Sequence, residues 1–139
     1  MNRRSGAWSG APGFGGNANA VQADDGFMKI VNLCDAECKA NPHGVEAKNM
    51  YDHEHALITH LMLLPGQALK RHNTPVDVAF YVLEGRGEVE IGEEKEIVGQ
   101  DAMIESPKGI PHLWRNVGTS PLRVLVMKLP RPAGKTKVL

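Results

Sequence analysis

Short apolar segments separated by turn-forming residues are the feature that most limits what this chain can fold into. From residue 27 onward, segments of four to ten residues alternate with clusters of Gly, Pro and Asn, and no helical period exceeds two turns. This spacing is typical of an all-β sandwich or jelly-roll barrel. The predicted strands are Phe27–Leu33, His55–Leu64, Val78–Leu83, Gly87–Ile91, Ala102–Glu105, His112–Asn116 and Leu122–Lys128.

Two of these segments are apolar on both faces. Between residues 56 and 64, Ala56, Ile58, His60 and Met62 alternate with leucine and threonine, and residues 122 to 129 show the same lack of a polar face. A strand that is apolar on both faces is usually covered on both. In a small barrel the outer cover must come from a terminal arm or from another subunit, so we predict a homodimer.

Size and charge narrow the class further. The chain has 139 residues and a mass of 15.1 kDa, which suits one domain. Lysine plus arginine and aspartate plus glutamate number 16 each, so no net field attracts nucleic acid or anionic lipid. No apolar run approaches the ~20 residues of a membrane span, and no export signal is visible at the start. We therefore expect a cytoplasmic protein that binds neither nucleic acid nor membrane.

The beginning of the chain differs in composition from the rest. Residues 1 to 26 are rich in Gly, Ala, Asn and Ser, with Trp8 and Phe14 as the natural anchors onto another surface. We predict a flexible or dimer-contacting arm at residues 1 to 26, a barrel at residues 27 to 130 and a tail at residues 131 to 139.

Two cysteines lie four residues apart. In a reducing compartment Cys34 and Cys38 are expected to be free thiols in or beside a turn. A zinc site that adds His43 and either His53 or His55 is the alternative, because Cys-x3-Cys is within the spacing that zinc tolerates. Otherwise these three histidines are expected in loops or on the surface.

Two histidines fall where a barrel could bring them together. Residues two apart on a strand share a face, so His72 and Thr74 share one parity with Val78 and Phe80, and His112 shares another with Trp114. On facing inner surfaces, His72 and His112 would supply half of a transition-metal site.

The residues around these histidines resemble the two motifs of the cupin superfamily. The first motif, Gly-x5-His-x-His-x(3 or 4)-Glu-x6-Gly, is matched at Gly66, His72 and Gly85. The second motif, Gly-x5-Pro-x-Gly-x2-His-x3-Asn, has seven residues instead of five between Gly99 and the proline, and its other four positions are matched in order. They are Pro107, Gly109, His112 and Asn116. The resemblance covers roughly residues 55 to 130 and implies a double-stranded β-helix, or jelly-roll barrel, with a Gly-rich N-terminal arm.

The resemblance also implies a metal site, but only two of its four ligand positions carry a histidine here. Metal-binding cupins hold one Mn, Fe, Ni, Cu or Zn ion with three histidines and a glutamate, which correspond here to His72, Thr74, Val78 and His112. Valine cannot coordinate, and a threonine hydroxyl is a weak donor. His60 is the candidate substitute, although a core histidine bonded to backbone explains it equally well, and a bulge near Pro75 that turns Asp77 inward is a lesser alternative.

Three functional interpretations stay open. The first is a small cupin that binds a small molecule, with a carboxylated one among the candidates, in a lumen lined by Thr74, Phe80, Met62 and Trp114. Arg71, Lys108 and Arg115 near the mouth would favour an anionic ligand, unless they are solvated surface charge. The second is a dioxygenase-like oxidoreductase or an isomerase that uses one divalent metal on His72, His112 and His60. The third is a non-catalytic dimeric interaction protein.

Overall fold

The computed structural model describes residues 26–134 and 137–139. The chain divides into two compact units, Met1–Asp35 and Ala36–Leu139. The predicted arm at residues 1 to 26, with Trp8 and Phe14, lies outside the described residues except for its last residue.

In the first unit, the described residues contain one short 3-10 helix, η1 (Leu33–Asp35), and no strand. The prediction of a strand over Phe27–Leu33 is wrong. Phe27 and Met28 are exposed, and this segment pairs with no strand in the part of the chain that the structure describes. An apolar run alone does not make a strand, because the backbone also needs a neighbouring strand to pair with.

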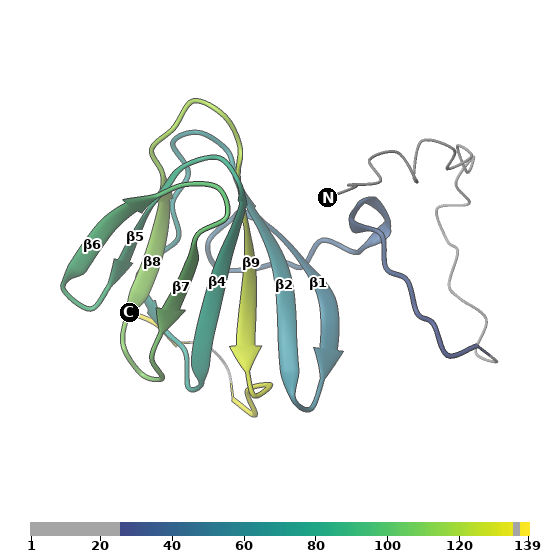
Figure 1. The fold of residues 1–139 in the computed structure, drawn as a ribbon. Helices are drawn as coiled ribbons and strands as arrows, with labels where there is room; N and C mark the ends of the chain where they lie inside the picture. Colours follow the sequence, from purple (N-terminus) through teal and green to yellow (C-terminus); the bar gives the residue numbers. More distant parts are fainter. Residues whose placement is uncertain (1–25, 135–136) are drawn as a thin grey trace, which may run out of the picture. The chain divides into compact units, whose positions relative to one another are not determined.

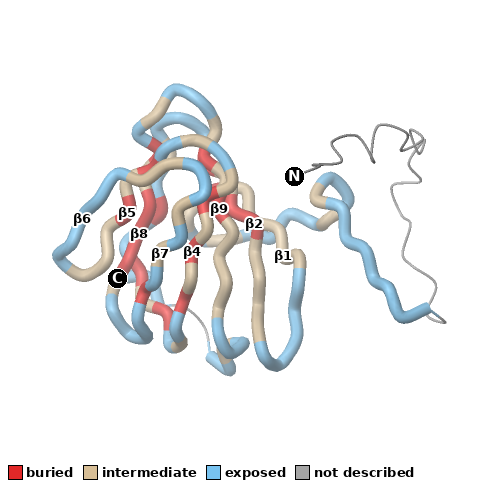
Figure 2. Tube along the Cα trace, viewed as in Figure 1, coloured by how far each residue is buried: buried red, intermediate tan, exposed pale blue. Residues whose placement is uncertain are grey.

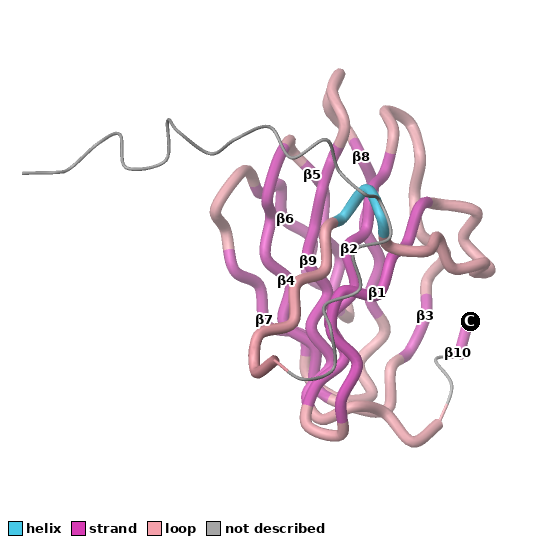
Figure 3. The backbone as a smooth tube through the Cα atoms, turned by 90° about the vertical axis from the view of Figure 1, so that its right-hand side faces the viewer, coloured by secondary structure: helices cyan, strands magenta, loops and turns pink. Residues whose placement is uncertain are grey.

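The described residues of the second unit form ten strands in two antiparallel sheets that face each other (Figures 1 and 3). The strands are β1 (Glu46–His53), β2 (Ala56–Leu63), β3 (His72–Asn73), β4 (Asp77–Glu84), β5 (Gly87–Ile91), β6 (Glu94–Val98), β7 (Met103–Ser106), β8 (His112–Asn116), β9 (Leu122–Leu129) and β10 (Lys137–Val138). One sheet has the order β1-β2-β9-β4-β7 and the other the order β10-β3-β8-β5-β6. This is the predicted all-β jelly-roll barrel.

Six of these ten strands match the predicted segments closely: β2, β4, β5, β7, β8 and β9. The predicted strands did not include β1, β3, β6 and β10, which are polar or only two residues long. Among the described residues, no helix is long and apolar enough to cross a membrane.

The core lies between the two sheets, and β4, β8 and β9 carry many of its buried residues. Buried stretches of the chain are red in Figure 2. Phe80 and Trp114 pack edge to face, with ring centroids 5.5 Å apart. Each is at most 1% exposed. Burying a side chain of this size stabilises the fold by about 1.5 to 3 kcal/mol. The strands that carry this core also carry the residues of the candidate site.

Candidate functional site

A cavity of about 470 Å³ opens between the two sheets beside the core. Its wall is mainly apolar, with two histidines and two basic side chains among the polar groups. The lining residues used below are His43, Leu57, Leu61, His72, Phe80, Val126, Lys128 and Arg131. Among all the described residues that line it, none is acidic. The volume suits a small organic molecule.

Three histidine rings lie in a row from the cavity into the core. His72 and His112 are direct cross-strand partners on β3 and β8, and their ring centroids are 4.5 Å apart. His43 also packs against His72, at a centroid distance of 4.8 Å. The expected meeting of His72 and His112 is therefore seen. The third ring, His43, was expected either in the alternative zinc site or in a loop, and it lies in the loop before β1.

The turn before β1 positions His43. The side chain of Asn41 accepts a hydrogen bond from the His43 N–H at 3.1 Å and donates one to the Val45 carbonyl at 2.7 Å. Gly44, with φ of 67°, completes this turn. The one usable sequence signal was Asn41-Pro42-His43-Gly44, a tight turn that fixes its histidine in place.

His112 is the most deeply placed ring. It is 3% exposed, its Nδ1 lies 2.6 Å from the Ser106 hydroxyl, and its Nε2 lies 3.4 Å from the Thr74 hydroxyl. Burial lowers the pKa of His112 to about 3, and the positive charges that His72, Lys128 and His43 can carry act in the same direction. His112 is therefore a neutral imidazole near pH 7.

Lys128 brings a positive charge into this apolar space. It continues the inward parity of Val124 and Val126 on β9, and its cross-strand neighbours are Leu57 and Val78. Burial lowers the pKa of the Lys128 amine. The sequence analysis did not single out this residue, although a lysine that shares its parity with lumenal valines was a visible signal.

Of the residues predicted to contact a ligand, Phe80 lines the cavity and Thr74 lies behind it, 2% exposed. Trp114 is fully buried core behind Phe80 and is not among the lining residues. Met62 belongs to the opposite face of β2, since the lining residues of that strand are Leu57, Thr59 and Leu61.

The structure does not bring His60 to the other two predicted ligands. His60 has the same parity as Met62 and therefore lies on the outer face of the sheet. There its Nε2 accepts a hydrogen bond from Arg123 Nε at 3.0 Å, and Arg123 also pairs with Glu84 at 3.2 Å. Burial and the Arg123 charge both lower the pKa of His60. The side chain acts as a buried acceptor for arginine.

The residues of the alternative zinc site are exposed or make other contacts. Cys34 and Cys38 are exposed and free, His53 packs on Tyr51, and His55 pairs with Glu54. Within residues 26–134 and 137–139, no three His, Cys, Asp or Glu side chains are grouped as a metal site requires.

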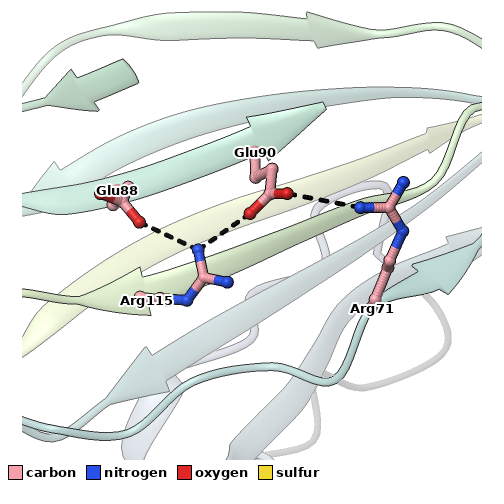
Figure 4. A network of polar contacts seen from close by, with 4 residues as sticks. All are labelled: Arg71, Glu88, Glu90 and Arg115. Atoms are coloured by element: carbon pink, nitrogen blue, oxygen red, sulfur yellow. Dashed lines mark hydrogen bonds and ion pairs between the residues drawn. The ribbon is translucent and has the colours of Figure 1, made fainter. Parts of the chain in front are cut away.

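Two of the three basic residues expected at the mouth are instead neutralised on the outer face of the second sheet (Figure 4). Arg115 donates to Glu88 and to Glu90 at 2.9 Å each, and Arg71 pairs with Glu90 at 3.3 Å. The hydrogen bond from Arg115 lowers the pKa of Glu90. The backbone N–H of Lys108 donates to Asp77, which leaves that carboxylate outside the lumen. The charge that reaches the cavity is that of Lys128 and Arg131.

The jelly-roll barrel and the adjacent His72 and His112 are the features that indicate the class of protein. The family model described as Cupin domain matches residues 59–128, and the chain belongs to this family. TT1209 from Thermus thermophilus is 35% identical, over 76% of this chain and 100% of its own, with a TM-score of 0.65.

Two further relatives show how far the likeness extends. The polyketide cyclase RemF from Streptomyces resistomycificus shares the fold at 21% identity, with a TM-score of 0.70 over 81% of this chain and 85% of its own. The uncharacterized protein MJ1618 of Methanocaldococcus jannaschii is 36% identical over 62 residues. That match covers 45% of this chain and 49% of the relative, so the chain spans about half the length of this curated relative.

The residues present do not fit the metal ion that many cupins hold. Thr74 and Val78 occupy two of the four ligand positions. His43 does not replace them, because its Nδ1 accepts a hydrogen bond from the Lys70 N–H at 2.8 Å, so the proton of its neutral ring is on Nε2. Lys128, which lines the same cavity, would also repel a cation.

Proposed function

We propose that this cupin binds a small carboxylated molecule in the lumen of the barrel, and that this binding does not depend on a metal. The observation that carries the proposal is the lining of the cavity, which contains Lys128 and Arg131 and, among described residues, no acidic side chain. A carboxylate placed there would meet a positive potential in a space of low dielectric.

Lys128 is the more buried of the two cations. Arg131 is already paired with Asp52, and this pairing lowers the pKa of Asp52 and raises the pKa of Arg131. Burial makes the charged form of Lys128 costly, and a carboxylate beside it would offset that cost with a charge-assisted hydrogen bond. Ligand binding is therefore expected to raise the pKa of Lys128.

The rest of the cavity suits an apolar substituent. Leu57, Leu61, Phe80 and Val126 line it from three strands. A compound with one carboxylate and a small hydrocarbon or aromatic group would use both kinds of surface.

The test compares carboxylates with neutral compounds of the same shape. Benzoate and phenylacetate are titrated against benzamide and phenylacetamide, with EDTA present, by calorimetry and by thermal unfolding. At 100 times its dissociation constant a ligand stabilises the folded state by about 2.7 kcal/mol. We expect carboxylates to raise the unfolding temperature and amides to leave it unchanged.

Lys128→Met should abolish the carboxylate response, whereas Lys95→Met, which removes an exposed lysine of the β5–β6 hairpin, should leave it intact. Equal binding of amides and carboxylates would contradict the proposal. So would a full carboxylate response in Lys128→Met, or a response that EDTA removes.

We also propose that the outer face of the first sheet pairs with a second copy of the chain. Tyr51, Met103 and Leu129 are 45%, 56% and 43% exposed on β1, β7 and β9. Light scattering should give a dimer mass that Met103→Glu reduces to a monomer mass. A monomer in the unaltered protein would contradict this proposal.

A further inference from the structure

The backbone of one residue, Lys70, holds two of the cavity histidines. The N–H of Lys70 donates to His43 Nδ1 at 2.8 Å, and the carbonyl of Lys70 accepts from His72 Nδ1 at 2.7 Å. A backbone N–H can only donate and a carbonyl can only accept. The neutral His43 ring therefore carries its proton on Nε2, and the neutral His72 ring carries its proton on Nδ1 and a lone pair on Nε2.

Both rings are held in the neutral form. Burial lowers the pKa of His43 to about 4, and the positive charges of His72, Lys70 and Lys128 act in the same direction. Burial also lowers the pKa of His72, against the hydrogen bond to Lys70. Near pH 7 the two rings thus present different groups at Nε2: a donor on His43 and an acceptor on His72.

These two groups are open to a ligand. Both histidines line the cavity that contains Lys128. In the part of the chain that the structure describes, the ring hydrogen bonds of both histidines are made through Nδ1. A donor and an acceptor on rings whose centroids are 4.8 Å apart can be satisfied together by a ligand that carries both kinds of group.

We infer that His43 and His72 form a donor–acceptor pair that selects small hydroxycarboxylates. The ligand carboxylate accepts from His43 Nε2–H and from Lys128, while a hydroxyl of the ligand donates to His72 Nε2. A ligand ammonium could also donate, but Lys128 and Arg131 in the same cavity would repel it. The inference rests on the proposed carboxylate site and adds the class of compound that the site prefers.

The expected preference follows from the unmade hydrogen bond. A ligand without the hydroxyl leaves the His72 acceptor facing an apolar group, and so does a ligand whose hydroxyl is methylated. The loss of one such hydrogen bond corresponds to about a tenfold weaker affinity. The carboxylate binding that remains depends on His43 and Lys128 alone.

The first experiment uses three matched ligands on the unaltered protein: mandelate, phenylacetate and α-methoxyphenylacetate. A smaller set, lactate and propionate, covers a ligand that lacks the ring. We expect each hydroxy acid to bind about tenfold more tightly than its partners. If the carboxylates bind with equal affinity, the inference fails and the proposed function stands. If none of these compounds binds, both fail.

Two variants assign the preference to its residue. His72→Leu should bring the affinities of mandelate and phenylacetate together, whereas His43→Leu should weaken both to a similar extent and preserve their ratio. A variant that only loosened the cavity would not change the ratio in this selective way. A preference that survives in His72→Leu would overturn the assignment.

A second measurement does not depend on variants that fold. The ¹⁵N chemical shifts of the histidine rings report which nitrogen carries the proton. We expect the Nε2–H form for His43 and the Nδ1–H form for His72 in the unaltered protein at pH 7. The opposite form in either ring would overturn the inference.

Discussion

The burial of His112 should make the protein lose stability in mild acid by an amount that one substitution reveals. In the folded chain the pKa of His112 is lowered to about 3, first by burial and then by its positively charged neighbours. In the unfolded chain the ordinary pKa is about 6.5. Between these two values the unfolded state binds a proton that the folded state does not. The free energy of unfolding therefore falls as the pH drops through this window.

The size of the effect follows from the two pKa values. Each pH unit inside the window costs about 1.4 kcal/mol for one histidine. Between pH 7 and pH 5 only the unfolded state gains the proton, so the loss attributable to His112 is about 2 kcal/mol. The result changes little if the folded pKa differs by one unit, because pH 5 stays above it. Burial lowers the pKa of His43 and of His72 as well, and both add to the slope.

The assay is urea unfolding at pH 7 and pH 5, with EDTA in both buffers, for the unaltered protein and for His112→Gln. Glutamine keeps a donor and an acceptor beside Ser106 and Thr74 but does not titrate. The variant should lose about 2 kcal/mol less between the two pH values. His55→Gln is the control, since its side chain is 86% exposed on the β1–β2 hairpin, and it should follow the unaltered protein. An equal loss in His112→Gln and the unaltered protein would show that His112 is not kept neutral by burial.

Two further outcomes are expected. Gly85→Ala should destabilise the fold by about 3 kcal/mol, because φ is 85° and an added Cβ would collide with the Pro121 carbonyl oxygen. Gly66→Ala, with φ of 84° and no atom within 4 Å, should cost only about 1 to 2 kcal/mol in urea unfolding, so equal losses would refute the collision. Protein purified without chelator should contain well under one metal ion per chain by elemental analysis, and a full equivalent would contradict the donor argument.

The placement of His60 shows that the sequence pattern could not decide which face of β2 points inward. Alternation correctly grouped His60 with Met62 on one face of β2, but both faces of that strand are apolar. Hydrophobicity therefore could not indicate which face points inward. The register with β9 decides it: His60 pairs with Leu125, and Leu61 pairs with Val124, which is fully buried. The inner face is consequently that of Leu57, Leu61 and the other odd-numbered residues.

The residues that matter most for the proposed binding differ in how far the sequence indicated them. The parity of Lys128 was available, because it lies two residues beyond Val126 in the same strand. The position of His43 was not, because its hydrogen-bond partner, the Lys70 backbone, is 27 residues away in the chain. A contact that depends on a loop folding over a strand has no periodic signal.

The motif residues divide into those that shape the backbone and those that carry chemistry, which explains why the barrel was easier to predict than the site. Asn116 donates to the Leu63 and Ser120 carbonyls at 2.9 Å each and accepts from the Gly118 N–H, and so ties three segments together. A residue in this role is needed whether or not a ligand binds. The side chains of Thr74 and Val78 do not tie backbone segments together in this way, so they can change while the barrel remains. With Thr74 and Val78 at two of the ligand positions and Lys128 beside Val78, these residues suit the proposed carboxylate ligand better than a cation.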